Sequence, residues 1–135
     1  MSVAATARVL VISYGAMLCV VGAAGILFAR WELGRVFSLD VTMWSHDVNA
    51  TFLNQYRFLK AVEFSSGLFC LAYLKSILTG EKSARIFLAL VAAGVAARII
   101  AWIADGQPSA LFLIFLALEI LVFCVVVIHL RQSND

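Results

Sequence analysis

Four long apolar runs limit what this chain can fold into. They cover residues 8–30, 51–78, 84–104 and 109–130. A helix that crosses the hydrocarbon core of a bilayer needs about 20 mostly apolar residues, and each run reaches that length. The runs therefore predict an all-α integral membrane protein with a single four-span transmembrane domain over residues 1–135, folded as an antiparallel four-helix bundle.

The composition agrees with this class. Of the 135 residues, 64% are hydrophobic, whereas soluble domains are roughly 45–50% apolar. The formal net charge is only +2, and no basic patch is interleaved with aromatic residues, so no nucleic-acid partner is expected. The first run is too long for a signal peptide and lacks a cleavage site, so we expect it to be a mature spanning helix.

Three cysteines, Cys19, Cys70 and Cys124, lie inside apolar runs. They form no CxxC pair, which excludes a thiol-disulfide oxidoreductase of the paired-cysteine kind. A thiol in such surroundings behaves as a small hydrophobic side chain, and this packing role is the expected one.

Glycine and other small residues predict the turns and the packing. Gly80, Gly106 and Pro108 mark two short connections, and short connections favour antiparallel neighbours. Small side chains let membrane helices approach closely. The residues expected to do so are Gly15, Gly22, Gly25, Ser66, Gly67, Ala89, Ala93, Ala96 and Ala97.

Residues 31–50 form a long amphipathic loop between the first two runs. The segment carries Trp31 and Trp44 together with several aliphatic residues. Such segments lie in the headgroup zone of a bilayer. Two interpretations stay open, a plain loop with interfacial anchors and a lid over a pocket that opens on that side.

Haem and metal sites have little support. His46 lies in the loop and His129 at the opposite end of the last run, so the two cannot ligate one iron. Asp40, His46 and Asp47 form only a weak metal pattern, and a solvated loop is the expectation. We therefore expect no metal and no cofactor.

Basic residues near the run ends predict the orientation. One side carries Arg8, Lys75, Lys82, Arg85 and Arg131. The other carries Arg30 and Arg35 together with Glu32, Asp40, Asp47 and Asp105. Because basic residues favour the cytoplasmic side, both termini are expected there, in a bacterial plasma membrane.

The stretch RFLKAVEF, residues 57–64, places three charges inside the second run. Lys60 and Glu63 are three positions apart and share a helix face. At 1.5 Å per residue, the side chains from Arg57 to Glu63 lie about 9–18 Å below the outer end of the helix. Arg98 and Glu119 are expected in the same slab.

Charges at that depth should point inward. Each one facing lipid would cost roughly 2.5–3.5 kcal/mol. We expect Glu63 and Glu119 to pair with Lys60 and Arg98, while Arg57 extends toward the interface. One interpretation is a salt-bridge network that sets helix register.

The other interpretation is a functional pocket that opens toward the outer leaflet. Its candidate ligand-binding residues are Arg57, Lys60, Arg98 and Tyr56. Its candidate catalytic residues are Glu63 and Glu119, since carboxyl groups in a dry site can act as general acids and bases.

Three functions fit such a pocket or network. The first is binding of a membrane lipid or another lipid-like or quinone-like small molecule, with a role as accessory subunit of a membrane complex. The second is an enzyme that acts on a lipophilic substrate by acid-base catalysis, and whether the chain is an enzyme stays open. The third is a structural subunit whose charges dock a partner's helices. A homo-oligomer is also expected, because so short a chain forms little interior.

Several short motifs resemble a known family. They are Arg57 opening the second helix, the small pair Ser66-Gly67, Arg98 late in the third helix, the hairpin Asp105–Ser109, and Glu119 in the fourth. Over residues 50–130 the chain resembles small bacterial four-helix integral membrane proteins classed as a domain of unknown function. Lys60 and Glu63 depart from that pattern. The resemblance implies an architecture and no established activity.

Overall fold

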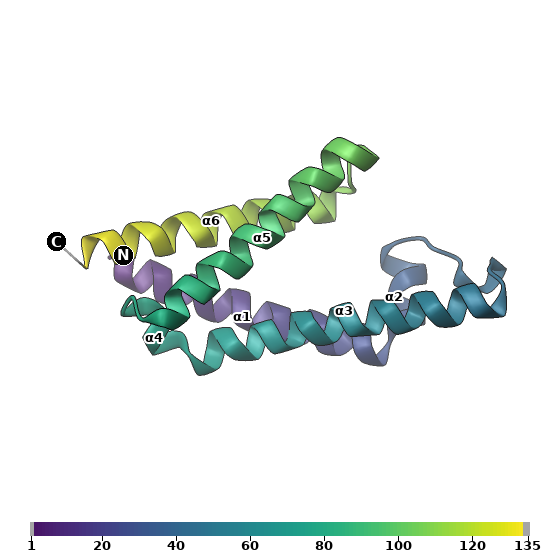
Figure 1. The fold of residues 1–135 in the computed structure, drawn as a ribbon, viewed down its shortest axis with the longest axis horizontal. Helices are drawn as coiled ribbons and strands as arrows, with labels where there is room; N and C mark the ends of the chain where they lie inside the picture. Colours follow the sequence, from purple (N-terminus) through teal and green to yellow (C-terminus); the bar gives the residue numbers. More distant parts are fainter. Residues whose placement is uncertain (1, 134–135) are drawn as a thin grey trace. The chain divides into compact units, whose positions relative to one another are not determined.

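In a computed structural model of the chain, which describes residues 2–133, all regular structure is helical. Figure 1 shows the elements in chain order. They are α1 (Val3–Leu27), α2 (Ala29–Val36), the 3₁₀ helix η1 (Val41–Met43), α3 (His46–Ala72), α4 (Leu74–Leu78), α5 (Lys82–Asp105) and α6 (Ala110–Gln132). No strand occurs in this part of the chain, which confirms the all-α class.

Three helices, α1, α5 and α6, are long and apolar enough to cross a membrane. They correspond to the runs predicted over residues 8–30, 84–104 and 109–130. Every 18-residue stretch of α3 contains at least three charged residues, because Arg57, Lys60 and Glu63 fall in all of them, and α3 is not among these three helices. Membrane-compatible helices are therefore established, while the four-span antiparallel bundle stays a prediction.

The second predicted span and the loop before it need correction. The span expected over residues 51–78 begins earlier, at His46, and breaks at Tyr73 before the short α4. Residues 31–50 are not a plain loop, because they hold most of α2, all of η1 and the start of α3. The physical reason is burial, since Ala29 and Leu33 lie on one helix face and are each only 1% exposed.

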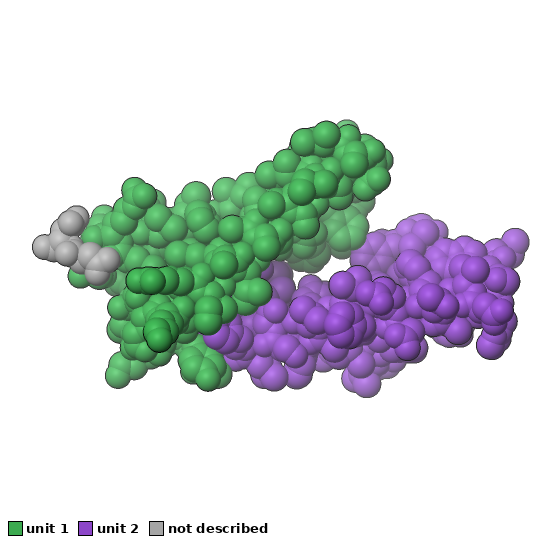
Figure 2. Space-filling view, in the orientation of Figure 1, with its two compact units in different colours: residues 1–13, 72–135 green, residues 14–71 purple. Residues whose placement is uncertain are grey.

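The chain divides into two compact units, which Figure 2 colours separately. Unit 1 comprises residues 1–13 and 72–135 and contains the start of α1 together with α4, α5 and α6. Unit 2 comprises residues 14–71 and contains the rest of α1 together with α2, η1 and α3. A single domain over the whole chain stays a prediction.

Glycines bring α1 and α3 close together within unit 2. A Cβ added at Gly22 would lie 2.5 Å from the backbone nitrogen of Phe64. One added at Gly67 would lie 2.6 Å from the carbonyl oxygen of Gly15. Gly15 contacts Gly67, and the later Gly22 contacts the earlier Phe64, so α1 and α3 run antiparallel. The predicted role of these glycines in packing is confirmed.

In unit 1, α5 and α6 form a hairpin, and α4 packs against both. Gly106 turns the chain with φ of 95°, a conformation that glycine adopts without steric cost. Its N–H donates to the Trp102 carbonyl over 3.2 Å. The small residues expected to pack on α5 are instead exposed, and they are Ala89, Ala93, Ala96 and Ala97. That part of the packing prediction is wrong for the described chain, since α5 buries its Phe87 face instead.

Candidate functional site

Lys60 lies between two carboxylates in unit 2. Its Nζ is 3.0 Å from Glu63 on the same helix and 3.4 Å from Glu32 on α2. The side chains of Lys60 and Glu32 are only 12% and 11% exposed. We call Glu32, Lys60 and Glu63 the acid–lysine cluster. Because two acids share one base, the cluster has acceptor oxygens to spare for a hydrogen-bond donor.

Glu32 is the member that sequence reasoning missed, since it was placed among the acids outside the membrane. The helix of α1 breaks at Phe28, and α2 then packs its apolar face on unit 2. Ala29 and Leu33 are part of a buried core with Val41 and Leu53. Glu32 lies on the same face of α2 and is buried with them. The apolar spacing of Ala29 and Leu33 was the signal in the sequence.

Gly25 on α1 leaves room for the cluster. A Cβ added there would overlap Lys60 Cδ and would lie 2.8 Å from Glu32 Oε2. The aliphatic part of Lys60 therefore crosses α1 at this glycine before its ammonium group reaches the two acids. Although α1 contributes no charge to the cluster, it shapes the space that the cluster occupies.

Two buried polar atoms beside Lys60 have no hydrogen-bond partner. They are Glu32 Oε2 and the hydroxyl oxygen of Tyr56. The Tyr56 ring lies 5.6 Å from Lys60 Nζ. Its hydroxyl faces the Glu32 carboxylate near hydrogen-bonding range, but the contact does not meet the geometry of a formed hydrogen bond. A buried polar atom without a partner costs roughly 1–3 kcal/mol, so a group that bonded to both atoms would bind favourably.

Aromatic rings surround Tyr56. Phe52 is stacked on it at 6.3 Å between centroids, and Phe37 meets it edge-on at 6.5 Å. Trp44 packs on Phe52 at 4.9 Å. These rings give the Tyr56 ring an apolar setting, while its hydroxyl faces the Glu32 carboxylate.

Arg98 and Glu119 form a second, partly buried ion pair, in unit 1. Arg98 Nε donates to Glu119 Oε2 over 2.9 Å, and Nη2 donates to Oε1 over 3.1 Å. Glu119 is 6% exposed. The rings of Phe112 and Phe115 lie 5.8 and 5.7 Å from Arg98 Cζ. The bidentate geometry engages both carboxylate oxygens.

Arg57 has a different partner from the other charges. Its Nε donates to the carbonyl oxygen of Ile26 over 3.2 Å. That carbonyl belongs to the last turn of α1, where carbonyl groups have no N–H donor within the helix. Arg57 is exposed and ties α3 to the end of α1, outside the acid–lysine cluster.

The histidines have structural surroundings. His129 Nε2 donates to the Leu78 carbonyl over 3.1 Å, which joins α6 to the end of α4. His46 Nδ1 is 3.5 Å from Asp47 Oδ1, and both side chains are exposed. Among residues 2–133, no three His, Cys, Asp or Glu side chains are grouped so as to hold a metal ion.

These features define a small all-α protein with membrane-compatible helices and two ion-pair sites that are buried in part. Residues 6–130 match the family described as "Domain of unknown function (DUF4345)". The match covers most of the chain, and the chain belongs to this family. No curated protein and no solved structure matches it. Family membership agrees with the resemblance noted in the sequence, and the family's description names no activity.

Proposed function

We propose that this membrane protein binds a lipophilic ligand whose hydroxyl group enters the acid–lysine cluster. The observation that carries the proposal is the pair of buried, unpartnered atoms, Glu32 Oε2 and the Tyr56 hydroxyl. A hydroxyl group both donates and accepts hydrogen bonds, so one ligand hydroxyl can serve both atoms. Apolar surroundings with a few convergent polar groups are typical of small-molecule sites.

Hydrogen-bonding capacity distinguishes between the quinone-like and lipid-like ligands that the sequence suggested. A quinone carbonyl only accepts hydrogen bonds, so it would bind the Tyr56 hydroxyl and leave Glu32 Oε2 without a donor. A quinol, or another lipid that ends in a hydroxyl, donates to the carboxylate and accepts from the phenol. We therefore favour a hydroxyl-bearing lipophile, with its apolar part lying among the apolar side chains of the membrane region.

The residues proposed to bind differ in part from those expected from the sequence. Tyr56 and Lys60 keep their ligand-binding role, and Glu32 and Glu63 join them. Arg57 is engaged with Ile26, and Arg98 is engaged with Glu119, so neither is assigned to the ligand here.

An acid-base enzyme has less support. Glu63 and Glu119 each meet a cation, at 3.0 and 2.9 Å, and they belong to different units. A general acid or base must reach the proton that it transfers. Glu32, unlike Glu63 and Glu119, has a buried oxygen without a formed hydrogen bond, so a catalytic role would fall first on Glu32.

Native mass spectrometry tests the proposal. The full chain is purified from its own membrane in a mild detergent, and small molecules that remain bound are identified. We expect a hydroxyl-bearing lipid that is lost in Tyr56→Phe and kept in the control Tyr73→Phe, whose ring is exposed. Tyr56→Phe removes a hydroxyl that forms no hydrogen bond of good geometry, so it should change the stability of the ligand-free protein little.

Two outcomes contradict the proposal. One is a wild-type chain that carries no lipid under conditions that preserve other membrane complexes. The other is equal retention of the lipid in Tyr56→Phe and Tyr73→Phe. A stoichiometric protein partner in place of a lipid would favour the alternative of an accessory subunit that docks its charges against partner helices.

A further inference from the structure

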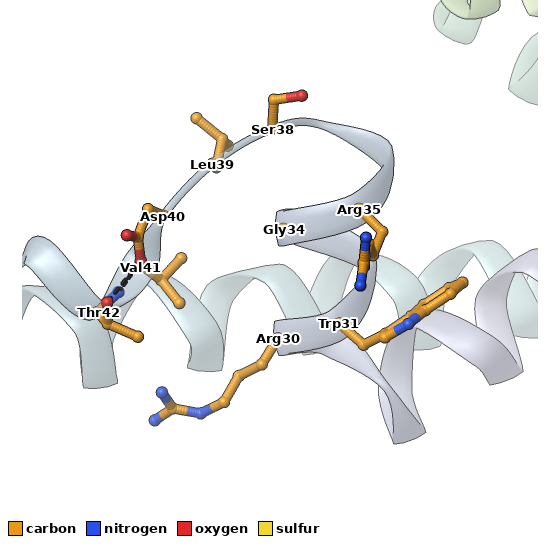
Figure 3. A pocket seen from close by; sticks show the side chains of 9 residues that line it. All are labelled: Arg30, Trp31, Gly34, Arg35, Ser38, Leu39, Asp40, Val41 and Thr42. Atoms are coloured by element: carbon orange, nitrogen blue, oxygen red, sulfur yellow. Dashed lines mark hydrogen bonds between the residues drawn. The ribbon is translucent and has the colours of Figure 1, made fainter.

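The outward face of α2 borders an open cavity of about 610 Å³. Figure 3 shows its lining. Residues Arg30, Trp31, Gly34 and Arg35 of α2 form one side, and the segment 38–42 forms the other. This face is distinct from the buried face that carries Glu32, and the acid–lysine cluster does not account for it.

The segment 38–42 is held in place by specific bonds. Ser38 has φ of 56°, an uncommon conformation for a residue other than glycine. The Leu39 N–H donates to the Leu33 carbonyl over 2.9 Å, which folds the segment back over the end of α2. Asp40 Oδ1 accepts from the Thr42 hydroxyl over 2.6 Å and from the Thr42 N–H over 3.0 Å. The cavity is therefore part of the folded structure.

The charge of the cavity favours an anion. Arg30 and Arg35 are exposed and form no ion pair with any residue that the structure describes. The one acid in the lining, Asp40, directs an oxygen to Thr42. Guanidinium groups bind phosphate in a bidentate manner, so phosphate groups match this face chemically.

The position of α2 favours a membrane surface as the source of that phosphate. The helix begins at Ala29, directly after α1, which is long and apolar enough to cross a membrane. Ala29 and Leu33 are buried, while Trp31 is 64% exposed and Val36 is 43% exposed. Tryptophan and basic residues are typical of helices that lie at the headgroup level.

The directions of the side chains favour several phosphates over one. In Figure 3, Arg30 extends from the start of α2 toward the side of Thr42, whereas Arg35 lies beside Trp31. The two guanidinium groups do not converge on one point. A lipid surface offers many phosphate groups, and a single free phosphate ion would satisfy only one arginine.

We propose that the outward face of α2 binds the headgroups of anionic phospholipids, with Arg30 and Arg35 each contacting a lipid phosphate and Trp31 lying at headgroup depth. This inference is independent of the ligand proposed for the acid–lysine cluster. It assigns α2 two roles, one for each face, and the buried face positions Glu32 while the outward face holds the helix at the interface.

The test uses the full chain in a neutral detergent, titrated with phosphatidylglycerol or phosphatidylcholine and followed by native mass spectrometry. The variant Arg30→Gln/Arg35→Gln removes the two charges from the face. The control Arg8→Gln/Arg85→Gln removes two exposed charges from unit 1. An interfacial arginine contributes about 1 kcal/mol of attraction to anionic lipid, so losing two should weaken phosphatidylglycerol binding roughly thirtyfold.

The expected result is preferential binding of phosphatidylglycerol that the Arg30→Gln/Arg35→Gln variant loses and the control keeps. Equal binding of the two lipids by the wild-type protein would overturn the proposal, because the contact would then be apolar. An equal loss in the control would also overturn it. Displacement of the lipid by an equal concentration of inorganic phosphate would identify a free-phosphate site in its place.

Discussion

Lys60 and Glu32 form an ion pair between helices, with Nζ 3.4 Å from Oε1. The pair joins α3 to α2, and α2 is the helix that the sequence did not predict. Both side chains are nearly buried. A buried charge is costly once its partner is removed, so the position of α2 depends on the pair between Lys60 and Glu32.

Lys60→Met should strongly destabilise the protein, because Glu32 and Glu63 would be left without their cation. Breaking a buried pair from one side typically costs about 3–5 kcal/mol. Lys60→Met/Glu32→Gln should regain part of that loss, since only one carboxylate then remains. Thermal unfolding in detergent, followed by circular dichroism, measures both variants.

The matched control for this prediction is Lys75→Met, which alters an exposed lysine on α4. Exposed substitutions usually change stability by no more than about 0.5 kcal/mol. If Lys60→Met and Lys60→Met/Glu32→Gln lose the same stability, the two side chains are not energetically coupled.

Arg98 and Glu119 should show coupling in a double-mutant cycle. Arg98→Ala and Glu119→Gln each break the bidentate pair and leave the partner without its counterion, so each should lower stability in detergent. The double variant should lose less than the sum of the two, with a coupling energy of about 0.5–3 kcal/mol. Strict additivity would show that the contact contributes nothing to stability.

Two glycines provide a test of the packing of α1 against α3. Gly22→Ala would bring a methyl group to 2.5 Å from the Phe64 nitrogen and 2.8 Å from the Lys60 carbonyl oxygen. Backbone atoms cannot move aside locally, so a loss of about 1–3 kcal/mol is expected. Gly34→Ala meets nothing within 4 Å and should stabilise α2 by about 0.5–1 kcal/mol.

Unfolding in detergent compares Gly22→Ala with Gly34→Ala directly. Both replace a helical glycine by alanine, so the difference between them isolates the close approach of the two helices. Equal effects of the two changes would show that α1 and α3 are not in backbone contact at Gly22.

The features that sequence predicts well depend on local spacing. Apolar runs identify α1, α5 and α6, and the three-residue spacing of Lys60 and Glu63 places both on one face. The sequence did not predict the burial of Glu32, because that burial depends on α2 packing back on unit 2. The spacing of Ala29 and Leu33 is the only sign of this helix face in the sequence. The break at Tyr73 has no proline or glycine beside it, so tertiary packing overrode a run that is helical by composition.

The turn before η1 should respond to acid. The Thr42 hydroxyl, and then the Thr42 N–H, donate to the Asp40 carboxylate and hold the pKa of Asp40 below its usual value of 3.8. Because the pKa in the folded protein is lower than in the unfolded chain, these bonds stabilise the turn above that value and are lost as pH falls through the folded pKa. Thr42→Ala removes the larger contribution and should raise the pKa of Asp40. A carbon NMR titration of the Asp40 carboxyl measures this, and identical midpoints in both proteins would mean that the hydroxyl does not bind the carboxylate in solution.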